Sequence, residues 1–71
     1  MAYSDKAAWE YLSAAFEQKK TFVEIYVLGR DEPLRATDLL AFDGHGFVEV
    51  RLDRSRTVVI RADHIATIMA A

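Results

Sequence analysis

The side chains that could do acid–base or nucleophilic chemistry are few in this 71-residue chain, and they are not grouped for catalysis. There is no cysteine that could act as a nucleophile, and a single serine, Ser55, lies in a predicted hairpin loop. Asp63 and His64 are adjacent on chain that we expect to be extended. Neighbouring side chains of extended chain point to opposite faces, so these two make a poor acid–base pair. No two carboxylates have a recognisable catalytic spacing. The sequence therefore predicts that the protein is not an enzyme and has no catalytic residues.

Metal and duplex binding are disfavoured by residue types and charge. His45 and His64, without any thiolate, are too few for a structural metal cluster, so we expect no metal and no cofactor. The formal net charge of −2 does not suit an electrostatic grip on duplex nucleic acid. Four arginines nevertheless fall in one eleven-residue stretch, 51–61, whose only acid is Asp53, and they could form a local basic surface. They are Arg51, Arg54, Arg56 and Arg61.

Chain length predicts one domain, 1–71, that gains stability by self-association. A chain of this size buries only about 60% of the surface of its unfolded form. Disulfides are excluded, and a hydrophobic content of 52% is high for so small a domain, which points to oligomerisation. We recognise no signal peptide and no apolar run of about 20 residues, so we expect a soluble, intracellular, cytoplasmic protein that does not engage membranes.

The first twenty residues have the pattern of an amphipathic helix, predicted over 4–20. Ser4 is a plausible N-cap, and no glycine or proline follows before residue 21. An apolar stripe recurs at helical spacing, formed by Trp9, Leu12 and Phe16 with Ala8 and Ala15. The stripe predicts that the helix packs on another element.

The remainder, 21–70, has the two-residue period of β-strands. We predict strands over 22–28, 34–42, 47–52, 57–61 and 64–69, with a tight hairpin loop at 53–56. A flat five-stranded sheet would leave half of its apolar residues uncovered. The predicted fold is therefore mainly β with one N-terminal helix, in a strongly bent, partly open antiparallel barrel. The last strand carries no charge or proline to discourage edge pairing, so we expect a cyclic homo-oligomer joined through edge strands.

Several segments together resemble the Sm-like family, small barrels that assemble into rings and bind single-stranded RNA. The family's first motif is similar to VEIYVLG at 23–29, LLAFDGH at 39–45 and FVEVRL at 47–52. Its second motif is similar to IRADHI at 60–65. The helix-first order, and the ending DHIATI at 63–68, are similar to the bacterial Hfq-like branch. The resemblance covers about two-thirds of the chain and implies an Sm fold, an SH3-like barrel.

The resemblance also implies a set of RNA-binding residues. In the family a base is held between a side chain from the loop after the second strand and one from the loop after the fourth, which correspond to His45 and Arg61. Imidazole and guanidinium planes can both stack on bases, at about 1–3 kcal/mol per base. Phe47, Asp63 and His64 lie in the same motifs and complete the set.

Departures from the family pattern limit what the resemblance implies. Gly46 or Phe47 stands where the family has the Asn that reads uracil, so uridine specificity does not carry over, although U-rich single-stranded RNA remains a candidate partner. Ala62 and Asp63 replace the Lys-His pair of the Hfq-like branch, so the RNA pocket of that branch does not carry over either. Lys19 and Lys20 correspond to a basic rim after its helix.

Each of these residues also has a structural interpretation. His45 suits an ordinary surface loop, and Arg61 suits an ion pair with Asp63 or Asp43. Phe47 suits a subunit interface as well as a stacking platform. The two lysines suit the negative end of the helix dipole, and Asp43 suits a cap on nearby loop amides.

Two functions follow from the resemblance and these alternatives. The first is a ring that binds single-stranded RNA at its pore, as an RNA chaperone or RNA-processing scaffold. The second is an Sm-like ring that serves as a protein assembly module without RNA. The position of His45 and Arg61, lining an open basic pore or buried in ion pairs, distinguishes the two.

Overall fold

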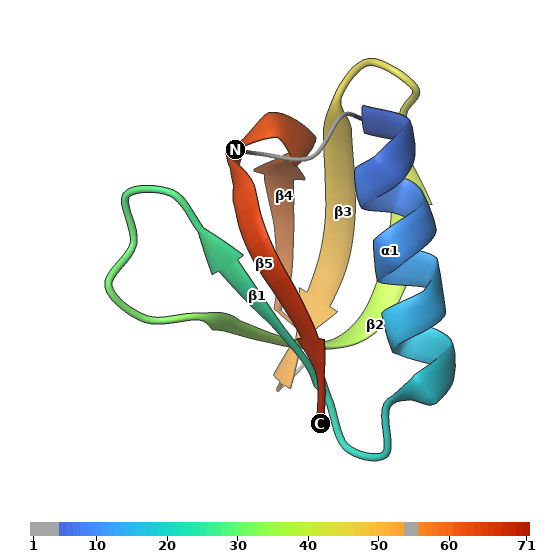
Figure 1. The fold of residues 1–71 in the computed structure, drawn as a ribbon, viewed down its shortest axis with the longest axis vertical. Helices are drawn as coiled ribbons and strands as arrows, with labels where there is room; N and C mark the ends of the chain where they lie inside the picture. Colours follow the sequence, from blue (N-terminus) through green and yellow to red (C-terminus); the bar gives the residue numbers. More distant parts are fainter. Residues whose placement is uncertain (1–4, 54–55) are drawn as a thin grey trace.

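The computed structural model describes residues 5–53 and 56–71, which form one helix and five strands. The structure is mainly β with one N-terminal helix, as predicted (Figure 1). In chain order the elements are α1 (Asp5–Gln18), β1 (Val23–Val27), β2 (Leu34–Phe42), β3 (Phe47–Leu52), β4 (Thr57–Arg61), the 3₁₀ helix η2 (Ala62–His64) and β5 (Ile65–Ala70).

The five strands form a single antiparallel sheet in the order β4-β3-β2-β1-β5. β2 pairs with different strands at its two ends: residues 34–36 pair with β1, and residues 36–42 pair with β3. Register shifts between Ala36 and Asp38 and between Leu39 and Ala41 interrupt its pairing with β3. Bulges of this kind bend a strand, and the β1–β5 pair runs obliquely in front of β3 and β4 in Figure 1.

The sheet is bent but is not closed into a barrel, because β4 and β5 form its two edges and do not pair with each other. Both edges carry exposed apolar side chains: Val59 on β4 is 61% exposed and Met69 on β5 is 50% exposed. In the part of the chain that the structure describes, no helix is long and apolar enough to cross a membrane.

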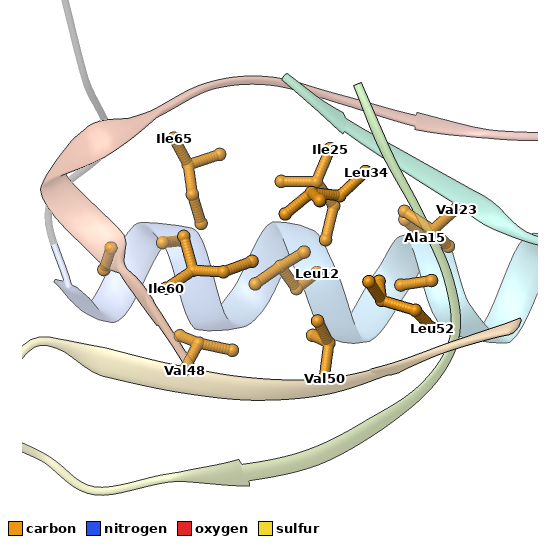
Figure 2. Packing of buried hydrophobic residues seen from close by; sticks show 13 residues of the cluster. Leu12, Ala15, Val23, Ile25, Leu34, Val48, Val50, Leu52, Ile60 and Ile65 are labelled. Carbon is orange, nitrogen blue, oxygen red and sulfur yellow. The ribbon is translucent and has the colours of Figure 1, made fainter. Parts of the chain in front are cut away.

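The core lies between the two arms of the bent sheet and the helix. Leu12 of α1 lies near its centre, with Ile25 and Ile65 on one side and Val48 and Val50 on the other (Figure 2). The predicted apolar stripe of the helix is the packed face. Its buried members are Ala8, Leu12 and Ala15, while Trp9 is half-buried and stacks on Phe42 of β2 with ring centroids 5.4 Å apart.

Most predicted bounds are confirmed, and the differences lie at the ends of elements. The strands predicted at 34–42, 47–52 and 57–61 are observed with those bounds. The helix ends at Gln18 rather than residue 20, and the first strand is Val23–Val27 rather than 22–28. The Ser4 cap, and residues 54–55 of the predicted hairpin loop, lie outside the described residues. The last strand is Ile65–Ala70 rather than 64–69, and it begins later than predicted because 62–64 form a 3₁₀ turn.

Candidate functional site

Four of the five predicted RNA-binding residues line one surface hollow of about 240 Å³. They are His45 and Phe47, from the β2–β3 connection, and Arg61 and Asp63, from the end of β4 and η2, with Gly46 between the first two. Two backbone features bring these segments together. Phe47 is opposite Arg61 in the β3–β4 ladder, and the Ala62 N–H donates to the Gly46 carbonyl at 2.8 Å.

The loop that carries His45 is held by Asp43. Its Oδ1 atom accepts hydrogen bonds from the backbone N–H groups of His45, at 2.7 Å, and Phe47, at 3.1 Å. The His45 N–H is the main reason that the pKa of Asp43 lies below its ordinary value of 3.8, and the Phe47 N–H lowers it further. Gly44 and Gly46 have φ values of +79° and +94°, a backbone conformation that residues with a side chain rarely adopt. The predicted capping role of Asp43 is confirmed. These hydrogen bonds hold the backbone of the loop from which the His45 side chain projects.

The opposite wall of the hollow is an ion pair between Arg61 and Asp63. Arg61 Nη2 donates to Asp63 Oδ2 at 2.8 Å, with both side chains about half exposed. Of the alternatives for Arg61, the pairing with Asp63 is the one observed. The pair is not buried, so the guanidinium lines an open hollow while bonded to a carboxylate.

The expectation that Asp63 and His64 point apart is wrong. The sequence pattern predicts extended chain there, but both residues lie in the 3₁₀ helix η2, in which neighbouring side chains do not point to opposite faces. His64 Nε2 is 4.0 Å from Asp63 Oδ1. That distance is too long for a hydrogen bond, and the contact is an ion pair only when His64 is protonated.

His64 is not part of the hollow formed by the other predicted residues. It lines a neighbouring hollow of about 300 Å³, together with mainly aliphatic side chains such as Val27 and Leu34. Its backbone carbonyl accepts a hydrogen bond from the Leu28 N–H at 2.8 Å, which ties η2 to the end of β1. His64 therefore has a structural contact that the sequence pattern did not indicate.

Lys19 and Lys20 lie at the other end of the domain. Both follow the last residue of α1, and the Lys20 N–H donates to the Ala71 carbonyl at 3.0 Å. In Figure 1 this end of the helix is at the bottom, whereas the β2–β3 connection is at the top. The two lysines and the hollow thus belong to separate surfaces of one subunit.

The described members of the arginine cluster, Arg51, Arg56 and Arg61, have different surroundings. Arg51 lies 3.7 Å from Asp38 on β2, and Arg54 is outside the described residues. Arg56 lines a separate hollow of about 540 Å³, which the sequence analysis did not anticipate. This hollow also contains Arg30, Arg35, Glu32 and Asp53. The sequence spacing gave no signal for it, because it joins the β1–β2 and β3–β4 connections.

The hollow lined by His45, Phe47, Arg61 and Asp63 suits one planar group with hydrogen-bonding edges. Its volume is below the roughly 300–1,000 Å³ typical of pockets for drug-sized ligands. Its lining offers an imidazole, a phenyl ring and a guanidinium plane for stacking, and the Arg61–Asp63 pair offers both donors and acceptors. No serine, threonine or cysteine is among its lining residues in the described part of the chain. The same part of the chain contains no group of three His, Asp or Glu side chains that could hold a metal ion.

Comparison with known proteins gave no match. A scan against family models, a search of curated proteins and a search of solved structures each found nothing similar to this chain. The likeness to the Sm-like family therefore depends on the sequence motifs alone.

Proposed function

We propose that this protein is an Sm-like, ring-forming protein that binds single-stranded RNA, as an RNA chaperone or RNA-processing scaffold. The observation that carries the proposal is the meeting of His45, Phe47 and Arg61 at one hollow. These residues come from two motifs separated by more than a strand, and the resemblance assigns His45 and Arg61 to opposite sides of a bound base. Each subunit would hold one base by stacking, which is worth about 1–3 kcal/mol per base.

Ring formation is supported by the two free edges of the sheet. β4 and β5 lie at opposite ends of the strand order, so β4 of one subunit can pair with β5 of the next. Such head-to-tail pairing closes into a ring when the rotation per subunit allows it. The exposed Val59 and Met69 side chains on these edges would gain cover in the ring. Repetition of the hollow around the ring would multiply a weak contact through avidity.

RNA binding is best tested by fluorescence anisotropy of labelled oligouridine and oligoadenine, at low and at physiological salt. The proposal expects saturable binding that survives physiological salt. Arg61→Ala is expected to weaken binding by about 5- to 150-fold, the range of one lost stacking contact, and to lower the salt dependence. Arg51→Ala is the matched control, because Arg51 is also an exposed, ion-paired arginine but lies outside the hollow.

The oligomeric state of the same samples is measured by light scattering after size exclusion. If the protein forms a ring, we expect an oligomer at micromolar concentration for the wild type and for Arg61→Ala. A wild-type monomer would contradict the ring. An Arg61→Ala variant that dissociates would assign Arg61 to assembly instead of RNA contact.

The second candidate is an Sm-like ring that assembles proteins without binding RNA. The Arg61–Asp63 ion pair favours it, because the carboxylate offsets the charge of the only Lys or Arg that lines the hollow in the described part of the chain. The net charge of −2 has the same effect on the whole surface. An oligomer that binds neither of these oligonucleotides nor a guanosine-containing one, even at low salt, would support this candidate over the first.

A further inference from the structure

We propose that the Arg61–Asp63 pair makes the hollow select guanine and reject uracil. This inference rests on the proposed function and names the base that the hollow would hold. In this arrangement the base stacks on His45 or Phe47, and Arg61 lies at the edge of the base instead of on its face, where the family resemblance would place it. Stacking tolerates any base, because every base has a π-face. Selection therefore falls to the lining side chains that can hydrogen-bond a base edge, and Arg61 and Asp63 are the charged members of that lining.

The carboxylate of Asp63 has acceptor capacity to spare. From the described residues it accepts one hydrogen bond, at Oδ2 from Arg61 Nη2, and a carboxylate has about four acceptor positions over its two oxygens. Oδ1 is 4.0 Å from His64 Nε2, beyond hydrogen-bond range. The side chain is 52% exposed, so a ligand in the hollow can reach it. The Arg61 guanidinium has five N–H groups and donates one of them to Asp63.

The pair offers a donor beside two acceptors, which is complementary to the edge of guanine. Guanine presents a carbonyl oxygen, a ring N–H and an amino group in a row. Arg61 can donate to the carbonyl, while the two oxygens of Asp63 accept from the ring N–H and the amino group. Carboxylates are used in this way to accept from base amino groups, and bidentate pairs of this type discriminate between bases.

Uracil does not fit the same pair. Its single ring N–H lies between two carbonyl oxygens, so a carboxylate that accepts from the N–H sets its other oxygen against a carbonyl. Adenine and cytosine each offer one amino group beside an acceptor nitrogen and can make one bond to Asp63. The expected order is guanine first, then adenine and cytosine, then uracil. The guanine preference over uracil is expected to be roughly 5- to 150-fold per bound base, the value of one good bidentate pair.

The test compares three labelled oligonucleotides of equal length by anisotropy: alternating guanosine–uridine, the same sequence with inosine for guanosine, and oligouridine. Inosine lacks the amino group, so it removes one of the two bonds to Asp63 and needs no protein variant. We expect the guanosine oligomer to bind most tightly, the inosine oligomer less tightly and oligouridine most weakly.

Asp63→Asn tests the residue itself. An amide has one acceptor oxygen in place of two, and its donor and acceptor match a carbonyl and ring N–H of uracil and of guanine alike, so the variant is expected to lose the guanine preference. Asp38→Asn is the control and should keep the wild-type order, because Asp38 is an exposed aspartate paired with Arg51 outside the hollow. Circular dichroism melting establishes that both variants fold.

Each failure has a distinct meaning. Wild-type protein that binds oligouridine as tightly as the guanosine oligomer would overturn the base selection and leave the proposed RNA binding intact. A folded Asp63→Asn variant with the wild-type order would also overturn it. Binding to none of the oligonucleotides would overturn the proposed function and this inference together.

Discussion

Replacing Leu12 by alanine is expected to remove about 3–5 kcal/mol from the free energy of unfolding. Leu12 is fully buried and lies between the two arms of the bent sheet, where neighbours on several sides keep a cavity from collapsing (Figure 2). Leu→Ala changes at such positions cost about 2.7–5.0 kcal/mol. At roughly 0.05–0.15 kcal/mol per residue, a 71-residue domain has about 4–11 kcal/mol in total. The variant is therefore expected to be at or near the limit of folding.

The matched control is Leu28→Ala, which makes the same chemical change at a side chain that is 56% exposed. Its expected cost is about 1 kcal/mol or less, and its backbone hydrogen bond to the His64 carbonyl is retained. Urea unfolding followed by circular dichroism and by the fluorescence of Trp9 gives both values. Trp9 is the only tryptophan and stacks on Phe42, so its signal follows the docking of α1 on the sheet.

Protein concentration must be varied, because self-association adds a concentration-dependent term to stability. At each concentration the difference between the two variants should stay at about 2–5 kcal/mol, since neither side chain is proposed to lie in the subunit contact. Equal losses for Leu12→Ala and Leu28→Ala would refute the packing of the helix against the bent sheet. A stable Leu12→Ala protein with an unchanged Trp9 signal would do the same.

Two predictions concern the loop that presents His45. The carboxyl of Asp43 is expected to titrate below 3.8, because the His45 and Phe47 N–H groups favour its charged form. Since the folded pKa is depressed, the stabilisation is complete above the unfolded value and is lost as pH falls through the folded one. Carbon-13 NMR of the carboxyl measures this, and a midpoint at or above 3.8 would contradict it. Gly44→Ala should cost about 1–2 kcal/mol although the space beside Gly44 is open, because its φ of +79° strains any side chain. Unchanged urea unfolding would show that this conformation is not required.

The sequence predicted which segments are helix and which are strand, because the spacing of apolar residues and the turn residues determine this within a few positions of the chain. The stripe around Leu12 predicted the packed face of the helix, and the alternation of Val48 and Val50 predicted the buried face of β3. The bend of the sheet was expected from the need to cover apolar side chains. Its location was not, because the register shifts in β2 arise from pairing with β1 at one end and β3 at the other.

The end of the chain shows where local reasoning fails. Residues 62–64 turn in a 3₁₀ helix, held by hydrogen bonds from the Ala62 N–H to Gly46 and from the Leu28 N–H to the His64 carbonyl. Both partners are distant in sequence, so neither bond is visible in the pattern of 58–69. The error about Asp63 and His64 follows from this turn. The same turn places His64 at a different hollow from His45 and Phe47, although Arg61 lines both hollows.

The hollow is separable from the fold that supports it. Its shape is set by backbone bonds, chiefly between Gly46 and Ala62, and by the cap at Asp43. Its lining side chains are largely exposed and are not part of the buried core. Substitution of Arg61 or Asp63 should therefore change what binds without the loss of stability that Leu12 would cause, because exposed ion pairs contribute only about 0–1 kcal/mol. It follows that a change in base preference upon Asp63→Asn, in a protein of unchanged stability, would be direct evidence that the hollow contacts the base.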